Sequence, residues 1–360
     1  MARDGSGCRM VPLAVNTPQR FYRGGERILR FRGLPTPPDF DGRRPEDWLG
    51  STTRLFAEGG DGLTVLPGGT PLPEALRLDP EGWLGADHRD RHGEDPGLLV
   101  KLLDAAERLP VHTHPDRHFA TRHLGCAHGK TEAWLVIEAE PGAMVWLGFR
   151  QDLSASRLAE LVEEQGEGLL GALNGFPVAR GDAVLVPAGQ PHAIGAGIMV
   201  VELQEPTDFS VMLEHQRFGL DPAHAWLGLD RDLALSSVAR DALDGDGLDA
   251  LRTTWDRGAG ASRALPVAAD EFFTAEVLDA REGSVTLPAR FSVLVVVGGE
   301  GSLTTSQDGR RIRAGDVFLT PFAAGPLTLG GQVTALRCSP SITGTPAPDT
   351  SPTHPVAEAP

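Results

Sequence analysis

Short apolar runs separated by glycine- and proline-rich turns dominate the pattern of hydrophobic and polar positions along the chain. Three of these runs, at 98–105, 133–137 and 198–208, are predicted to form β-strands. Glycine and proline are frequent, with 44 and 29 residues, and both residue types interrupt regular structure. Because short runs between frequent turns are typical of strands, the pattern predicts a mainly β protein with many turns.

One region within the first half has helical spacing instead. Leu158, Leu161 and Val162 recur at the period of a helix, and either Asp152 or Ser154 could cap its N-terminus. Acidic residues occupy the intervening positions and favour a solvent-facing side. The spacing therefore predicts a helical insertion between the strands.

The second half repeats the β pattern after another helical stretch. Residues 221–263 are acidic, and apolar positions from 235 to 243 follow one helix face, so we expect a helical linker region. Strand-like runs return from about 264 to 339. Within them, Ala314–Pro321 echoes Ala179–Pro187, a faint internal repeat that predicts a second β unit.

The two ends of the chain carry no such pattern. Residues 1–16 predict a flexible arm. Residues 340–360 are dominated by serine, threonine, proline and alanine and predict a disordered tail. The first β unit is then expected at 17–220, with the helical insertion at about 151–174.

Composition narrows the possible functions. The 360 residues carry a net charge of −16, and no basic stripe is present that could bind the phosphates of a nucleic acid. No apolar run has the length of a membrane span, and the N-terminus has no apolar signal core. Three widely spaced cysteines imply no disulfide framework. We therefore expect a cytoplasmic protein that binds neither nucleic acid nor membrane; the oligomeric state stays open.

Four ligand-type residues predict a metal site. His112 and His114 lie at i and i+2, so on a strand both side chains point to one face. Glu132 stands at the head of the run 133–137, and His192 follows a strand and a tight turn. Imidazole and carboxylate together suit zinc, iron, manganese or nickel. The alternative is that these are core and turn histidines of a structural barrel.

Three further residues are candidates for chemistry beside this site. Lys130 would share the strand face of Glu132 and could act as an acid/base; the alternative is a salt bridge. Lys101 interrupts an apolar strand and must reach water or an anion, as a substrate contact or at a barrel rim. Glu202 alternates with apolar residues and faces either the cavity or solvent.

The motifs around these residues resemble the two-part metal motif of cupin barrels, and more narrowly type I mannose-6-phosphate isomerase. The family signatures are similar to His112–Asp116, Gly129–Trp134 and Pro187–Gly195. The resemblance implies two cupin-like (jelly-roll) barrels, with a metal only in the first. It also implies one Zn²⁺, or another divalent metal, held by the four ligand-type residues, which are His112, His114, Glu132 and His192.

By the same resemblance the protein is an isomerase that interconverts mannose 6-phosphate and fructose 6-phosphate through an enediolate. Lys130 is then the expected proton carrier, Glu202 a second one, and Lys101 a substrate contact. The family places a catalytic arginine where this chain has Met212. Arg217 is the nearest arginine in sequence that could replace it.

Two departures from the family pattern keep other functions open. Met212 cannot hold a phosphate, and Pro110 stands where the family often has a serine. The alternatives are a metal-cupin isomerase or epimerase that acts on another sugar, including an unphosphorylated one, and a sugar-binding or regulatory protein without turnover.

Overall fold

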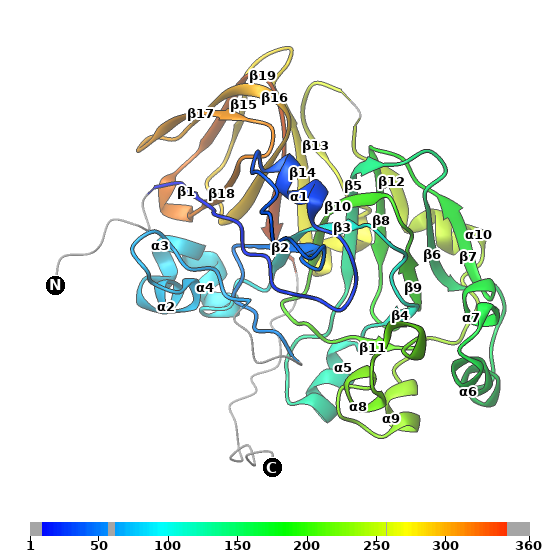
Figure 1. Ribbon diagram of the computed structural model, residues 1–360. Helices are drawn as coiled ribbons and strands as arrows, with labels where there is room; N and C mark the ends of the chain where they lie inside the picture. The colour runs from blue at the N-terminus through cyan, green and yellow to red at the C-terminus, as the bar shows by residue number, and fades with distance from the viewer. Residues whose placement is uncertain (1–8, 57–61, 257, 344–360) are drawn as a thin grey trace.

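The computed structural model describes residues 9–56, 62–256 and 258–343, and three antiparallel sheets form most of it (Figure 1). The mainly β class predicted from the sequence is confirmed. The predicted tail at 340–360 lies outside the described residues from 344 onward.

Two of the sheets form the first barrel. The six-stranded sheet has the order β12-β8-β5-β10-β3-β2, and the five-stranded sheet has the order β11-β4-β9-β6-β7. The strands of the first are β2 (Glu46–Leu49), β3 (Leu99–Ala105), β5 (Glu132–Ala139), β8 (Asp182–Val186), β10 (Ile198–Gln204) and β12 (Arg252–Thr254). Those of the second are β4 (His112–Thr113), β6 (Met144–Phe149), β7 (Leu173–Pro177), β9 (His192–Ile194) and β11 (Val211–Met212).

The third sheet has eight strands and forms the second barrel, seen in yellow to red in Figure 1 except for its blue N-terminal strand β1. β16 and β19 are long strands at its centre, and they pair with each other along most of their length. Its strands are β1 (Val11–Pro12), β13 (Gly260–Arg263), β14 (Phe273–Asp279), β15 (Val285–Leu287), β16 (Ser292–Thr304), β17 (Gly309–Arg313), β18 (Val317–Thr320) and β19 (Leu327–Pro340).

The central strands of the six-stranded sheet are buried on both faces. On β5, Leu135 packs in the core shared with the second barrel, whereas Trp134 and Val136 pack inside the first barrel. On β10, Val201 and Val200 divide in the same way. Because side chains alternate along a strand, Glu132 and Glu202 fall on the inner face. The open alternative for Glu202 is thus decided in favour of the cavity.

Short helices cover the edges of the barrels. They are α1 (Glu26–Phe31), α2 (Leu72–Leu78), α3 (Pro80–Leu84), α4 (Ala86–His92), α5 (Arg117–Phe119), α6 (Ala155–Glu164), α7 (Glu167–Gly171), α8 (Pro222–Ala225), α9 (Arg231–Leu235) and α10 (Gly245–Ala250). A π-helical turn at Ala120–Leu124 follows α5, and 3₁₀ turns lie at Gln216–Phe218, Val267–Glu271 and Phe322–Ala324. None of the helices in the described part of the chain has the length and apolar character that a membrane crossing needs.

The helical insertion formed where its spacing predicted. α6 and α7 lie within 151–174, and the Ser154 hydroxyl accepts a hydrogen bond from the N–H of Arg157 as the N-cap of α6. The buried face of α6 carries Leu158, Leu161 and Val162.

The helix expected from the apolar period at 235–243 did not form, because α9 ends at Leu235. The backbone beyond it bonds to other strands and loops: Ala239 donates to the carbonyl of Gly189, and Leu243 donates to that of Phe149. These tertiary pairings replaced the helical hydrogen bonds, while Leu235 and Val238 still pack inward. The region 221–263 therefore holds strands β12 and β13 as well as helices.

The part of the expected flexible arm that the structure describes, from residue 9 to 16, is held against the two barrels instead. Val11 pairs with Leu319 of β18, and the side chain of Met10 is buried. Residues 1–8 lie outside the described chain. The N-terminal segment then runs from the second barrel to the first, where Asn16 donates its side-chain N–H to the carbonyl of Trp48.

Candidate active site

Three histidines from neighbouring strands meet inside the first barrel. His112 on β4 lies opposite His192 on β9 in the antiparallel register, and His114 follows two residues after His112. The ring centroid of His112 is 4.2 Å from that of His192 and 5.0 Å from that of His114. All three side chains are buried, and together they could hold a metal ion.

Backbone carbonyls fix the orientation of each ring. Nδ1 of His112 lies 2.9 Å from the carbonyl oxygen of Pro110, and Nδ1 of His114 lies 2.8 Å from that of Phe209. His192 makes the same contact with the carbonyl of Gln190, at 2.8 Å. Because a carbonyl only accepts, each Nδ1 carries the proton and each Nε2 keeps a free lone pair. Pro110 thus supports the site through its backbone.

Burial keeps two of the imidazoles neutral. It lowers the pKa of His112 well below the usual value, and the neighbouring His192 acts in the same direction. Burial also lowers the pKa of His114, to about 3, with a further contribution from the Lys130 ammonium. A neutral imidazole is the form that binds a metal.

Glu132 adjoins the histidines and supplies negative charge. Its Oε2 lies 3.0 Å from Nε2 of His114, and its Oε1 lies 3.3 Å from Nε2 of His192. Burial alone would raise its pKa, but Lys130 and His114 outweigh burial and hold the pKa of Glu132 well below its usual range. Trp134, on the same strand face, donates its Nε1–H to Oε1 at 2.9 Å.

The donor set fits a divalent metal ion. Nε2 of His192 is buried and makes no hydrogen bond, although Glu132 is close to it. An unpartnered buried nitrogen is costly unless another ligand satisfies it. Three imidazoles and one carboxylate are ligands that zinc and related metals accept.

Lys130 lies directly beside this group. Its Nζ is 3.0 Å from both Nε2 of His114 and Oε2 of Glu132. The preceding Gly129 lies against the backbone of the histidine loop, where a Cβ atom would be only 2.7 Å from the carbonyl oxygen of Pro115. The N–H of Lys130 donates to that same carbonyl at 3.0 Å. This close approach requires a glycine before the lysine.

Glu202 provides a second titratable group on the cavity wall. It pairs in register with Lys101 on β3 and with Trp134 on β5, and its Oε1 lies 3.9 Å from Nζ of Lys130. Burial and the nearby Glu132 carboxylate raise the pKa of Glu202 to about 8. Two carboxyl groups in one cavity thus have strongly different proton affinities, which is an arrangement common at catalytic sites.

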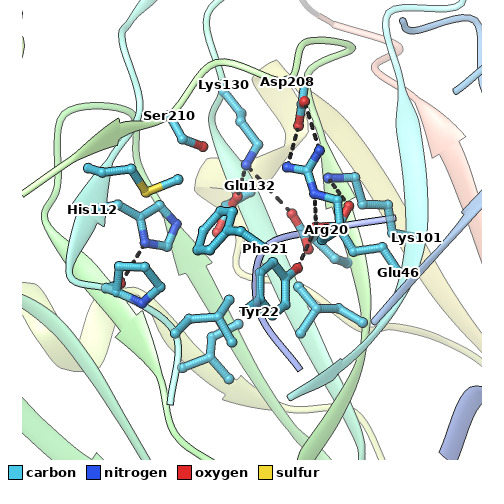
Figure 2. A pocket seen from close by; sticks show the side chains of 16 residues that line it. Arg20, Phe21, Tyr22, Glu46, Lys101, His112, Lys130, Glu132, Asp208 and Ser210 are labelled. Carbon is cyan, nitrogen blue, oxygen red and sulfur yellow. Dashed lines mark hydrogen bonds and ion pairs between the residues drawn. The ribbon is translucent and has the colours of Figure 1, made fainter. Parts of the chain in front are cut away.

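His112, Lys130, Glu132 and Glu202 line a small cavity of about 40 Å³, which we call the inner cavity. Figure 2 shows His112 on one side, Glu132 near the middle, and Arg20 with Asp208 on the other side. Lys101 lies on the same side as Arg20, with its Nζ 3.3 Å from the Glu46 carboxylate. Arg20 donates two hydrogen bonds to Asp208, at 3.1 and 3.2 Å.

A second cavity, the outer cavity, adjoins the first and measures about 230 Å³. It is largely apolar, with Leu55 and Phe56 among its lining side chains. Both cavities share five lining residues. They are Arg20, Phe21, Asp208, Ser210 and Met212.

The structure brings most of the predicted site residues together. All except Arg217 line the inner cavity or belong to the histidine group. Arg217 is exposed, with its Nη1 3.9 Å from the Glu167 carboxylate, and is not at the cavity. Arg217 lines neither cavity, so the structure does not support the catalytic role expected for it.

Sequence reasoning missed residues that reach the cavity from the N-terminal segment and from β2, chiefly Arg20, Tyr22 and Glu46. For the two predicted lysines, the sequence carried a further signal, which is their rarity. The chain contains two lysines in 360 residues, Lys101 and Lys130, and both are buried in this wall. Elsewhere the chain uses arginine as its basic residue.

The curated proteins that this chain resembles in sequence include mannose-6-phosphate isomerases. No protein-family model matches the chain. It is 28% identical over 305 residues to a mannose-6-phosphate isomerase of Streptococcus mutans, covering 83% of this chain and 88% of that protein. It is 26% identical over 253 residues to the mannose-6-phosphate isomerase ManA of Bacillus subtilis, covering 68% and 76%.

Solved structures share the fold. The crystal structure of mannose 6-phosphate isomerase from Bacillus subtilis superposes with a TM-score of 0.71 at 22% identity, covering 91% of this chain and 99% of that one. An E264A variant of phosphomannose isomerase from Salmonella typhimurium gives a TM-score of 0.72 at 16% identity, covering 92% and 100%.

Proposed function

Because the chain belongs to the mannose-6-phosphate isomerase family of cupin-fold proteins, we propose that it interconverts mannose 6-phosphate and fructose 6-phosphate in a metal-dependent reaction. The observation that carries this proposal is the buried histidine group with Lys130 beside it, at one end of a cavity. The odd number of widely spaced cysteines supports a cytoplasmic location.

We assign the metal ligands as His112, His114, Glu132 and His192, and Zn²⁺ as the metal. A zinc ion held there would polarise the sugar oxygens at C1 and C2 and stabilise the charge that develops on them. The protein contributes the fixed Nδ1 hydrogen bonds, which hold the rings in position before any ligand arrives.

The isomerisation moves one proton between C2 and C1 of the sugar. We assign Lys130 as the group that takes and returns this proton, because its Nζ lies at the metal-proximal end of the cavity. Glu202, with its pKa raised to about 8, can hold a proton near neutral pH and exchange it with a sugar oxygen. Lys101 is placed to contact a hydroxyl farther along the wall.

One observation favours a second candidate, an isomerase or epimerase that acts on an unphosphorylated sugar. Every lysine and arginine that lines the inner cavity lies beside a carboxylate: Lys130 beside Glu132, Lys101 beside Glu46, and Arg20 beside Asp208. A cavity with its positive charges balanced in this way also suits a neutral polyol.

A coupled assay separates the candidates. Mannose 6-phosphate and unphosphorylated mannose are each offered to metal-loaded protein, to EDTA-treated protein and to the His114→Ala variant. The proposal requires turnover of mannose 6-phosphate by loaded protein and its loss in both treated forms. Turnover of mannose alone would establish the second candidate, and bound metal without any turnover would contradict both.

A further inference from the structure

Arg20 stands at the boundary between the inner and the outer cavity, because its side chain lines both. It is only 14% exposed and comes from the N-terminal segment before β2, not from a strand of the barrel. Met212, which also borders both cavities, carries no charge.

Arg20 also lies at the opposite end of the inner cavity from the histidines. Figure 2 shows His112 at one side and the Arg20–Asp208 pair at the other, with Lys130 and Glu132 between them. A hexose phosphate that places its C1 and C2 oxygens at the histidine end must extend its C6 group away from that end. Its phosphate then points to the passage into the outer cavity.

The other cations of the two cavities are less suited to receive a phosphate. Lys130 is held at the histidine end by His114 and Glu132. Lys101 is 3% exposed, and its Nζ lies 4.8 Å from the ring centroid of Trp48, against the wall. His224 lines the outer cavity but not the inner one, and its side chain is 57% exposed, whereas Arg20 borders both cavities and is also 3.3 Å from Glu46.

We propose that Arg20 receives the 6-phosphate of the substrate at the boundary of the two cavities and is the residue that selects phosphorylated sugars. The inference rests on the proposed isomerase function. It assigns to a segment outside the barrel the positive charge that Met212 cannot supply.

The geometry of the pair supports this role. Nη1 and Nη2 of Arg20 together hold the two carboxylate oxygens of Asp208, a forked arrangement that also matches two oxygens of a phosphate. Asp208 is therefore the group that a phosphate exchanges with. It keeps a second contact, because the N–H of Phe56 donates to its Oδ2 at 3.3 Å. Ser210 adds a hydroxyl at the same boundary.

The test compares Arg20→Gln and Arg20→Lys with a matched control, Arg23→Gln, in metal-loaded full-length protein. Arg23 lies on the same segment and is exposed. For Arg20→Gln we expect KM for mannose 6-phosphate to rise about 10- to 100-fold, the range for losing a charged hydrogen bond, with a much smaller change in kcat. The KM of Arg20→Lys should lie between those of the wild type and Arg20→Gln, since lysine keeps the charge without the forked pair of donors.

Calorimetric titration with fructose 6-phosphate and with fructose gives a readout independent of turnover. Arg20→Gln should lose affinity for the phosphorylated sugar and not for fructose, while Arg23→Gln should match the wild type. Melting temperatures identify any variant that fails to fold. If Arg20→Gln does not fold, the KM and the affinity of Arg20→Lys decide whether Arg20 binds the phosphate.

The outcomes separate this inference from the proposed function. If the wild-type protein turns over mannose 6-phosphate and both Arg20 variants keep the same KM, the role of Arg20 is overturned and the isomerase function is not. Absence of turnover, with phosphate-dependent binding that is lost in Arg20→Gln, overturns the isomerase alone. Absence of both turnover and fructose 6-phosphate binding overturns the two together.

Discussion

His112 of β4 lies directly opposite His192 of β9, and their ring centroids are 4.2 Å apart. β4 has two residues and β9 has three, so the register between two very short strands sets this distance. The geometry of the metal site therefore depends on how these strands are held by their neighbours, β11 and β6.

Removing one of the paired histidines should abolish tight metal binding. For His192→Ala we expect metal affinity to fall by more than about 100-fold, the upper range for losing a contact that merely supports a ligand. Metal analysis after dialysis measures the loss. The exposed His118 is the control, and His118→Ala should retain the metal content of the wild type. Full metal content in His192→Ala would contradict the ligand assignment.

The hydrogen bond from Trp134 to Glu132 should tune metal affinity without binding the metal. Trp134→Phe keeps most of the buried ring but removes the donor to Oε1, so we expect a loss of about 10- to 100-fold in affinity. Trp255→Phe is the matched control, because the Trp255 indole is buried and its Nε1 makes no hydrogen bond. Competition with a chromophoric chelator would measure both variants, and equal losses would count against a specific role for Trp134.

Lys130 should be needed for turnover and not for metal retention. Lys130→Met removes the amine beside His114 and Glu132, and we expect kcat to fall about 10²- to 10⁴-fold, the usual contribution of a positioned acid/base. Metal content should stay at the wild-type level, because the four ligands remain. A variant that loses metal together with activity would show that Lys130 instead supports the ligands.

Stability should depend on pH through His128. Burial lowers the pKa of His128, but its hydrogen bond and charge interaction with Asp95 outweigh burial, so the folded-state pKa is raised. A raised folded pKa means that this stabilisation is fully present below the unfolded value of about 6.5 and is lost as pH rises through the folded pKa. Between mildly acidic and mildly alkaline pH, the melting temperature of the wild type should therefore fall more than that of His128→Gln. Parallel curves would exclude this contribution.

The grouping of the proposed metal ligands could be predicted from the sequence because local spacing determines where their side chains point. The i, i+2 spacing predicts a shared face for His112 and His114, and likewise for Lys130 and Glu132, although His114 lies just after β4 and Lys130 just before β5. The P-A-G turn before His192 likewise marks a tight connection, and the N–H of Gly189 donates to the carbonyl of His114 at 2.7 Å.

The other end of the cavity could not be predicted in this way. Arg20 and Asp208 are 188 residues apart, and no local period connects them. Arg217 was expected nearby because it is close to Met212 in sequence, yet it is 61% exposed on its own turn. Contacts of this kind depend on the path of a loop through space, which a pattern of apolar positions does not encode.

The two buried lysines have a practical consequence. Because Lys101 and Lys130 are the only lysines of the sequence, reagents that modify primary amines have no other side-chain target than the cavity wall. An amine-directed label would therefore report cavity access and its protection by ligands, with the α-amino group as the one competing amine. By the same reasoning, coupling the protein to a support through lysine would act at the inner cavity, so immobilisation should use another functional group.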